Sequence, residues 1–152
     1  MKSSHNVALH GDLFGTDYIL EMREISYFRP SEEVNADNVR HLAECIAKAN
    51  FWTAPIPVHR DTGIVMDGNH RIQAARLLGL THLPCVPMDY GDRRVSVFHW
   101  ETGEPFAVDH IFRTLDSNNV LPYKTTRHLF SPQLPQTDIP LPQLRAADHL
   151  AK

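Results

Sequence analysis

The 152-residue sequence has few of the features that mark disulfide-rich, membrane-spanning or nucleic-acid-binding proteins. Its two cysteines, Cys45 and Cys85, are too few for a disulfide framework and lack metal-ligand spacing, so we expect two buried thiols in a reducing cytoplasm. No apolar run is long enough to span a bilayer, and the first 15 residues lack the apolar stretch of a secretory signal. The net charge of -3 gives no basic excess for nucleic acid. We therefore expect neither a membrane nor a nucleic acid as partner.

The composition is otherwise that of an ordinary globular domain, with 42% apolar and 22% charged residues. We divide the chain into three parts. Residues 1–17 form a polar segment, residues 18–130 hold the periodic patterns that build a core, and residues 131–152 form a proline-rich tail. Because proline interrupts helices and central strands, we expect this tail to be a short irregular extension that wraps the surface or stays mobile.

Four segments have the apolar pattern of strands. They are residues 18–28, 54–68, 82–90 and 93–100, and the second is expected to fold as two short strands around a turn at 61–63. Pro84 and Pro87 place the 82–90 strand near a sheet edge or at a bulge, because proline lacks the N–H that a ladder needs on both sides.

Three segments have helical patterns. Within residues 31–50, Asn35 or Asp37 is a suitable cap, and the apolar stripe consists of Val39, Leu42, Ile46 and Ala49. A second helix is expected at about 70–78, where Gly79 ends it, and a third at about 107–116. The order strand, helix, hairpin, helix, strand, strand, helix predicts a small α+β domain with a mixed sheet.

The most informative polar cluster is Asp67-Gly68-Asn69-His70-Arg71, at the corner between a strand and the second helix. The free N–H groups of a helix start suit an anion, and glycine lets the backbone approach a ligand. Arginine adds donors that match phosphate oxygens, and an aspartate can hold Mg²⁺. The alternative is that Asp67 or Asn69 simply caps the helix while Arg71 is solvated.

Two further clusters flank this corner in the sequence. Glu32 and Glu33 precede the first helix, where one of them can be a general base or a metal ligand, or both can act only on the helix dipole. Residues 123–128, YKTTRH, follow Pro122 in an expected loop. Their hydroxyl, basic and imidazole groups can bind phosphate or carboxylate, or they form an exposed basic turn.

Together, FRPSEEV, the segment from Pro55 to Tyr90 and KTTRH resemble the ParB/sulfiredoxin-like superfamily, and within it most closely the free L-serine kinases. The resemblance spans about residues 18–130, with the D-G-x-H-R corner and the T-T-R-H segment as its most specific parts. It implies a ParB/sulfiredoxin-like domain that uses Mg²⁺ and ATP or ADP to phosphorylate the hydroxyl of free serine. The implied product, O-phospho-L-serine, feeds cysteine or siderophore-type biosynthesis.

The resemblance also implies roles for individual residues. Glu32 would be the catalytic base, and Asp67 would assist catalysis or hold magnesium. The nucleotide would contact Gly68, Asn69, His70, Arg71, Thr125, Thr126 and Arg127. The amino acid would contact Trp100, Thr126 and His128. At two positions the chain departs from the pattern, since Ser31 replaces a usual histidine and Asn69 replaces a histidine or an apolar residue.

Other branches of the superfamily fit less well. Sulfiredoxin chemistry needs a cysteine in the corner, where this chain has Asn69. A DNA-partitioning role needs a helix-turn-helix domain and a basic face, for which we see no room in residues 119–152. A non-catalytic nucleotide sensor or ParB-like regulatory module stays open as the alternative. We expect a cytoplasmic monomer or homodimer whose partners are a nucleotide and a free amino acid.

Overall fold

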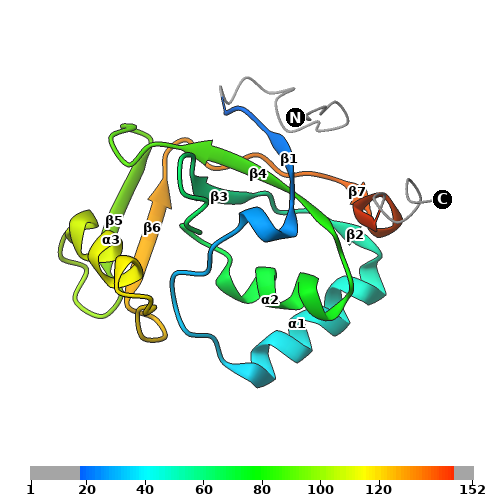
Figure 1. Cartoon of the computed structure of the whole chain (residues 1–152). Helices are drawn as coiled ribbons and strands as arrows, with labels where there is room; N and C mark the ends of the chain where they lie inside the picture. Colours follow the sequence, from blue (N-terminus) through cyan, green and yellow to red (C-terminus); the bar gives the residue numbers. More distant parts are fainter. Residues whose placement is uncertain (1–17, 146–152) are drawn as a thin grey trace.

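The computed structural model describes residues 18–145 as an α+β fold, which confirms the predicted class (Figure 1). The strands are β1 (Glu21–Glu24), β2 (Phe51–Trp52), β3 (Ile56–His59), β4 (His82–Met88), β5 (Val95–His99), β6 (Thr126–Phe130) and β7 (Ile139–Pro140). The helices are α1 (Ala36–Ala49), α2 (Asn69–Leu77) and α3 (Val108–Asp116), with 3-10 turns at Ile25–Tyr27 and Leu141–Arg145. Among residues 18–145, no helix is long and apolar enough to cross a membrane.

The main sheet is mixed, with the strand order β1-β4-β3, so that β4 is antiparallel to β1 and parallel to β3. The expectation that the strand with Pro84 and Pro87 lies near an edge is therefore wrong. β1 pairs with the first half of β4 and β3 pairs with the second half. Each proline thus has a neighbouring strand on one side only, so its missing N–H does not interrupt a two-sided ladder.

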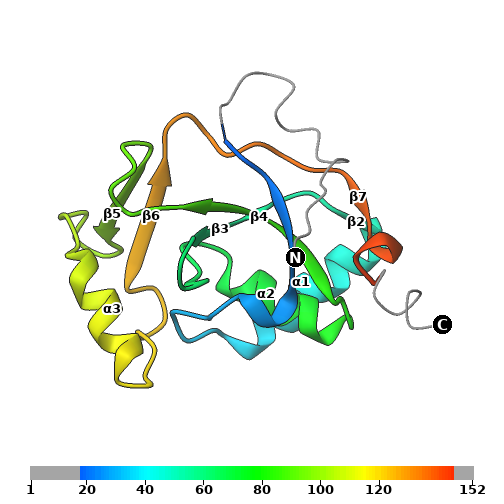
Figure 2. The same ribbon diagram turned by 45° about the horizontal axis from the view of Figure 1, so that its top comes forward.

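Helices α1 and α2 pack against each other and cover one face of this sheet (Figures 1 and 2). The side chain of Asn35 accepts from the Asn38 N–H, which confirms Asn35 as the cap of α1. Two expectations for this helix are wrong. Its buried face holds Val39 and Ala43, whereas Ala49 is exposed, and Cys45 lies on the solvent side. Cys85 is buried as expected, and burial raises the pKa of its thiol to about 12.

β5, β6 and α3 form a second unit beside the main sheet (Figure 2). The segment expected to be a loop continues as a strand from Thr126, since residues 126–130 pair antiparallel with β5. Val97 lies opposite His128, and both face the interior, where α3 contributes Ile111 and Leu115. The alternation that marks β5 also runs through β6, but its polar residues Thr126 and Arg127 conceal it in the sequence.

The proline-rich segment contributes to the core up to residue 145. β7 pairs with β2, and Ile139, Leu141 and Leu144 are buried in the same cluster as Trp52. Thr137 also donates from its hydroxyl to the carbonyl of Trp52, at 2.7 Å. The segment therefore wraps the surface of the main sheet and fills the end of its core. Residues 1–17 and 146–152, which hold the polar N-terminal segment and the end of the tail, lie outside the described part.

Candidate functional site

A cavity of about 660 Å³ lies between the N-terminal ends of α1 and α2 and the β5–β6 unit. Its volume falls within the range of small-molecule sites, roughly 300–1,000 Å³. The predicted site residues that line it are Glu32, Asp67, Gly68, Asn69, His70, Arg71, Trp100, Thr126, Arg127 and His128. The fold thus brings together the three polar clusters, which are far apart in the sequence. Thr125 is the exception, because it stands outside the lining and its hydroxyl donates to the Pro122 carbonyl.

The corner before α2 depends on Gly68, whose φ of 107° lies in the left-handed region. A Cβ at this position would come within 2.9 Å of Ile56 Cδ1 and 3.2 Å of Arg71 Nη2. Gly68 occupies the N-cap position, and no side chain of the described residues caps the helix there, so the capping alternative is wrong. The free N–H groups of the first turn stay available at the cavity wall.

Asn69 faces the other cluster instead of its own helix. Its Oδ1 accepts from the backbone N–H of Ser31 at 2.7 Å and, more weakly, from that of Glu32 at 3.4 Å. Its Nδ2 donates to Ser31 Oγ at 3.2 Å, and this hydroxyl donates onward to the Val65 carbonyl at 2.7 Å. The two positions at which the chain departs from the pattern of the family it resembles therefore contact each other.

Glu32 reaches across to the β5–β6 unit. Its Oε2 accepts from both the backbone N–H and the hydroxyl of Thr126, at 2.8 and 2.6 Å. The backbone on either side is also held, because the Leu121 N–H donates to the Ser31 carbonyl and the Glu33 N–H donates to the Leu121 carbonyl. The carboxylate is thus fixed at the cavity wall by bonds that originate in β6 and in the segment before it.

His70 is a neutral donor in this arrangement. Its Nε2 accepts the Asn35 backbone N–H at 3.0 Å, so in the neutral ring the proton is on Nδ1. Burial lowers the pKa of His70, the nearby Glu32 opposes this shift and Lys124 adds to it. The ring packs edge-on against Tyr123, with 5.5 Å between centroids. His70 can therefore donate to an anion at neutral pH without carrying a charge itself.

Two buried polar atoms of the described residues have no hydrogen-bond partner, Arg71 Nε and His128 Nδ1, and both belong to residues that line the cavity. Such atoms are costly unless a ligand or water satisfies them. His128 Nε2 is 2.9 Å from the Tyr90 hydroxyl, and burial lowers the pKa of His128 to about 4. His128 is therefore neutral at pH 7, and its Nδ1 is buried without a hydrogen-bond partner among the described residues.

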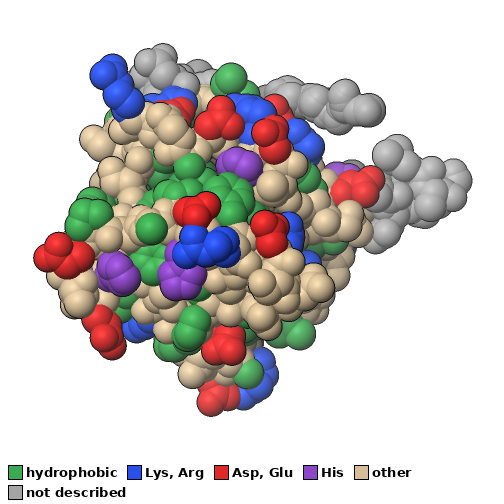
Figure 3. Space-filling model, turned by 60° about the vertical axis from the view of Figure 1, so that its left-hand side comes forward, with side chains coloured by type: hydrophobic (Ala, Val, Ile, Leu, Met, Phe, Trp, Pro, Cys, Tyr) green, Lys and Arg blue, Asp and Glu red, His purple; other side chains and the backbone are tan. Residues whose placement is uncertain are grey.

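A rim of aromatic and basic side chains borders the same cavity. Lys124 Nζ lies 5.3 Å from the Trp100 ring centre and 5.4 Å from that of Tyr123, and the Arg127 guanidinium carbon is 5.5 Å from Trp100. Tyr123 and Lys124 belong to the predicted cluster of residues 123–128, although no individual role was predicted for them. The lining residues that the sequence did not predict are Asn38, His41, Leu42, Met66 and Leu129. Figure 3 shows the side of the molecule that carries β5, β6 and α3, where charges of both signs are interspersed with histidines.

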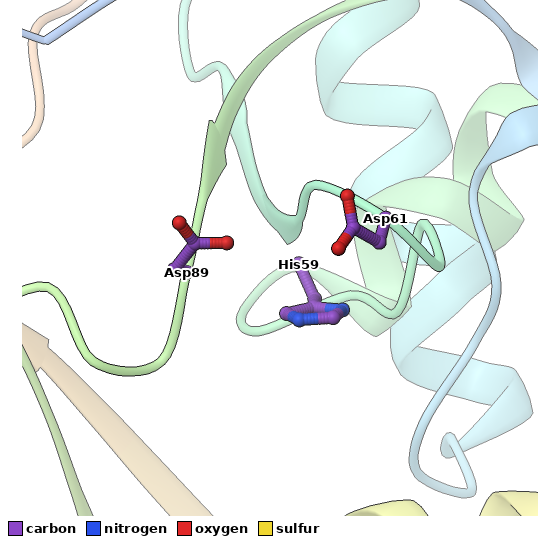
Figure 4. Close-up of side chains that lie close together, drawn as sticks. All are labelled: His59, Asp61 and Asp89. Carbon is purple, nitrogen blue, oxygen red and sulfur yellow. The ribbon is translucent and has the colours of Figure 1, made fainter.

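Two places offer carboxylates to a metal. Asp67 lines the cavity, and one exposed aspartate there fits magnesium, which commonly takes one or two carboxylates together with phosphate oxygens. The side chains of His59, Asp61 and Asp89 lie within 4.8 Å of one another at the ends of β3 and β4 (Figure 4). This group stands outside the cavity lining, both aspartates are exposed, and His59 Nδ1 is already bonded to Thr62 Oγ1 at 2.8 Å.

Comparison with known proteins gives a clear answer on the fold. No protein-family model matches the chain. A ParB-like protein of Sulfolobus acidocaldarius is 34% identical over 85 residues, which is 56% of this chain and 42% of that protein. The chain therefore spans about two fifths of the length of the curated relative it matches.

Several solved structures have the same fold. A free serine kinase in complex with AMP, a mutant form, superposes with a TM-score of 0.74 at 12% identity, covering 84% of this chain and 94% of that one. A complex of such a kinase with ADP gives 0.73 at 13% identity, covering 85% and 94%. A conserved hypothetical protein from Pyrococcus furiosus gives 0.69 at 15%, covering 85% and 97%. The α+β fold implied by the sequence is thus confirmed as the fold of the free serine kinases, and at these identities the similarity concerns the fold alone.

Proposed function

We propose that the chain is a small-molecule kinase that transfers a phosphoryl group from ATP or ADP to the hydroxyl of a free amino acid, with L-serine as the first candidate. One observation carries this proposal. Glu32 and the N-terminus of α2 line the same cavity, together with Arg71 and His128, each of which has a buried nitrogen without a hydrogen-bond partner among the described residues. The serine kinases of the same fold are described in complex with AMP and ADP, which supports a nucleotide ligand.

The donor phosphates would lie at the start of α2. There the left-handed Gly68 begins the helix, and the N–H groups of its first turn would donate to the phosphate oxygens. Arg71 would satisfy its Nε on a phosphate oxygen, and the neutral His70 would donate from Nδ1. Asp67 would hold Mg²⁺, which neutralises phosphate charge when bound. Arg127 would complete the nucleotide side from β6.

The acceptor would lie between Glu32 and the rim of aromatic and basic side chains around Trp100. Oε2 of Glu32 is occupied by Thr126, so Oε1 is the oxygen that would take the proton of the acceptor hydroxyl. The hydroxyl oxygen would then form a bond to the terminal phosphorus as the bond to the leaving nucleotide breaks. The products would be the phosphorylated amino acid and ADP from ATP, or AMP from ADP.

The charges around the cavity suit an amino acid as acceptor. A free amino acid carries a carboxylate and an ammonium group, and each needs a partner of opposite charge or a hydrogen bond. Lys124 and Arg127 lie on the rim near Trp100, and Glu32 and Glu33 line the same cavity. His128 would provide a neutral contact. Serine fits this set through its short hydroxyl side chain.

The test is to incubate the protein with Mg²⁺, ATP or ADP and L-serine, and to detect phosphoserine by mass spectrometry and phosphorus NMR. L-threonine and L-homoserine serve as parallel acceptors, and L-alanine, which lacks a hydroxyl, is the negative control. Formation of phosphoserine that needs both the nucleotide and the metal supports the proposal. Nucleotide binding without turnover of any acceptor would instead favour a sensor or regulatory module.

A further inference from the structure

The Ser31–Asn69 contact carries an inference beyond the proposed reaction, on which it rests. The amide oxygen, the amide nitrogen and the hydroxyl of this small network each make a hydrogen bond. The amide oxygen of Asn69 faces two backbone N–H groups, its nitrogen faces Ser31 Oγ, and the single Ser31 hydroxyl proton goes to the Val65 carbonyl. Only one orientation of the Asn69 amide satisfies these hydrogen bonds, because a flipped amide would place its NH₂ donor against both backbone N–H groups.

The network lies where the backbone has little other support. Residues 31–33 form neither a helix nor a regular strand, and they are held on one side by the two bonds with the Leu121 backbone. On the other side, Asn69 is the residue that attaches them to α2. Ser31 is only 4% exposed, so the contact is shielded from water, which would otherwise compete for its hydrogen bonds.

The consequence concerns the carboxylate of the next residue. Asn69 holds the backbone through the N–H of Ser31 and, more weakly, through that of Glu32, and the Glu32 carboxylate ends on Thr126, so the side chain is held at both ends. The start of α2 also carries the groups proposed to bind the donor phosphates, Gly68, His70 and Arg71, which we call the phosphate cradle. We propose that Asn69 is a positioning residue that sets the Glu32 carboxylate at a fixed place relative to the donor phosphates, and that Ser31 acts through Asn69 as part of the same unit.

A double-mutant cycle tests this coupling. The variants are N69A, S31A and the double variant, and Q73A is the matched control because Gln73 is an amide on the same helix whose side chain contacts the exposed Arg76. We expect N69A to lower kcat by about 10- to 100-fold, since a misplacement of 1 Å costs on this scale, while the Kd for ADP changes less than threefold. The double variant should lose no more than N69A alone, since the two residues act as one unit.

A second readout does not depend on turnover. Amide hydrogen exchange at Thr126 reports whether the Glu32 carboxylate still accepts its N–H, and we expect faster exchange in N69A and unchanged exchange in Q73A. If N69A does not fold, S31A is measured in the same way, because it breaks the Nδ2 contact but leaves the Oδ1 acceptor in place.

The failures of the two proposals are distinguishable. A wild-type protein that binds ADP but phosphorylates no acceptor overturns the kinase, while the exchange experiment still decides the positioning. Unchanged Thr126 exchange in N69A, a loss confined to nucleotide Kd, or additive losses in the double variant would each overturn the positioning role of Asn69.

Discussion

Glu32 and Thr126 lie 94 residues apart in the chain, yet one carboxylate oxygen of Glu32 accepts both the amide and the hydroxyl of Thr126. This contact joins the segment before α1 to β6, which belongs to the other unit of the fold. It closes one side of the cavity with charge-assisted hydrogen bonds, which are stronger than neutral ones. The carboxylate of Glu32, the proposed base, is therefore held by β6, across the cavity from the start of α2.

Removing the Thr126 hydroxyl should loosen this base. In T126V the backbone N–H is retained and the shape is nearly conserved, so we expect kcat to fall by about tenfold, corresponding to about 1.4 kcal/mol. T126S keeps the hydroxyl and should retain most of the activity. Steady-state kinetics with saturating nucleotide measures both variants, and equal activity of T126V and T126S would contradict the contact's role.

Replacing the proposed base should abolish turnover and leave binding intact. Glutamine in E32Q can still accept hydrogen bonds from Thr126 but cannot take a proton, so we expect kcat to fall by about 10²- to 10⁴-fold. The Kd for ADP should stay within a fewfold of wild type. E33Q is the matched control, since Glu33 lines the same cavity but is exposed. Turnover by E32Q that approaches that of E33Q would exclude Glu32 as the base.

Arg71 should matter for the nucleotide. Its Nε is buried and unpaired among the described residues, and R71A removes the donors proposed to bind phosphate. We expect the Kd for ADP to rise by about tenfold or more, because a charge-assisted hydrogen bond is worth roughly 1.5–3 kcal/mol. Titration calorimetry compares R71A with R76A, which removes an exposed arginine from the same helix. The same Kd in R71A and R76A would remove Arg71 from the phosphate cradle.

Gly68 should be required for the fold of the corner. Alanine there would adopt a left-handed φ and place its Cβ within 2.9 Å of Ile56 Cδ1. We expect G68A to lower the free energy of unfolding by about 1–3 kcal/mol. G91A is the control, since a Cβ at Gly91 meets no described atom within 4 Å. Urea denaturation gives both values, and a G68A protein as stable as G91A would show that the corner tolerates a side chain.

The buried His128 should make stability depend on pH. Its pKa is about 4 in the folded state, against an ordinary value of 6.5, because burial disfavours the charged ring. Below pH 6.5 the unfolded chain binds a proton that the folded protein does not. Stability is therefore lost as the pH falls from about 6.5 to about 4, by an amount on the order of 3 kcal/mol for this group.

The variant H128Q isolates this contribution. It keeps a polar side chain but removes the titrating ring, so its unfolding free energy should fall less than that of wild type between pH 6.5 and pH 4. Denaturant titrations at several pH values in this range give both curves. Parallel curves for the two proteins would mean that His128 titrates normally in the folded state.

The sequence alone predicted those local features that depend on only a few neighbouring residues. The Asn35 cap, the end of α2 at Gly79 and the alternation of β5 follow from propensities over a few residues, and the structure confirms them. The D-G-N-H-R corner was also recognisable, because a glycine and basic residues at a helix start have a direct physical meaning. What these residues contact could not be read from the chain.

The remaining features depend on contacts between distant segments. The central place of β4 depends on two partners that each cover half of it, and no property of Pro84 or Pro87 indicates this. The strand β6 was hidden by its polar residues, and it pairs with a strand from which α3 separates it in the sequence. The bond between Asn69 and Ser31 likewise joins residues whose separate patterns suggested only a cap and a turn.

The hydroxyl of Thr137 and the carbonyl of Trp52 join positions 85 residues apart, next to the pairing of β7 with β2. The intervening chain includes the Asp67–Arg71 corner, Trp100 and the Lys124–His128 segment, so most of the residues that line the cavity belong to one long loop of the chain whose ends this hydrogen bond joins. Closing a loop of this length costs entropy before the buried side chains return any gain. The rate at which the polypeptide reaches its native state is thus tied to this closure, since sequence-distant contacts slow folding.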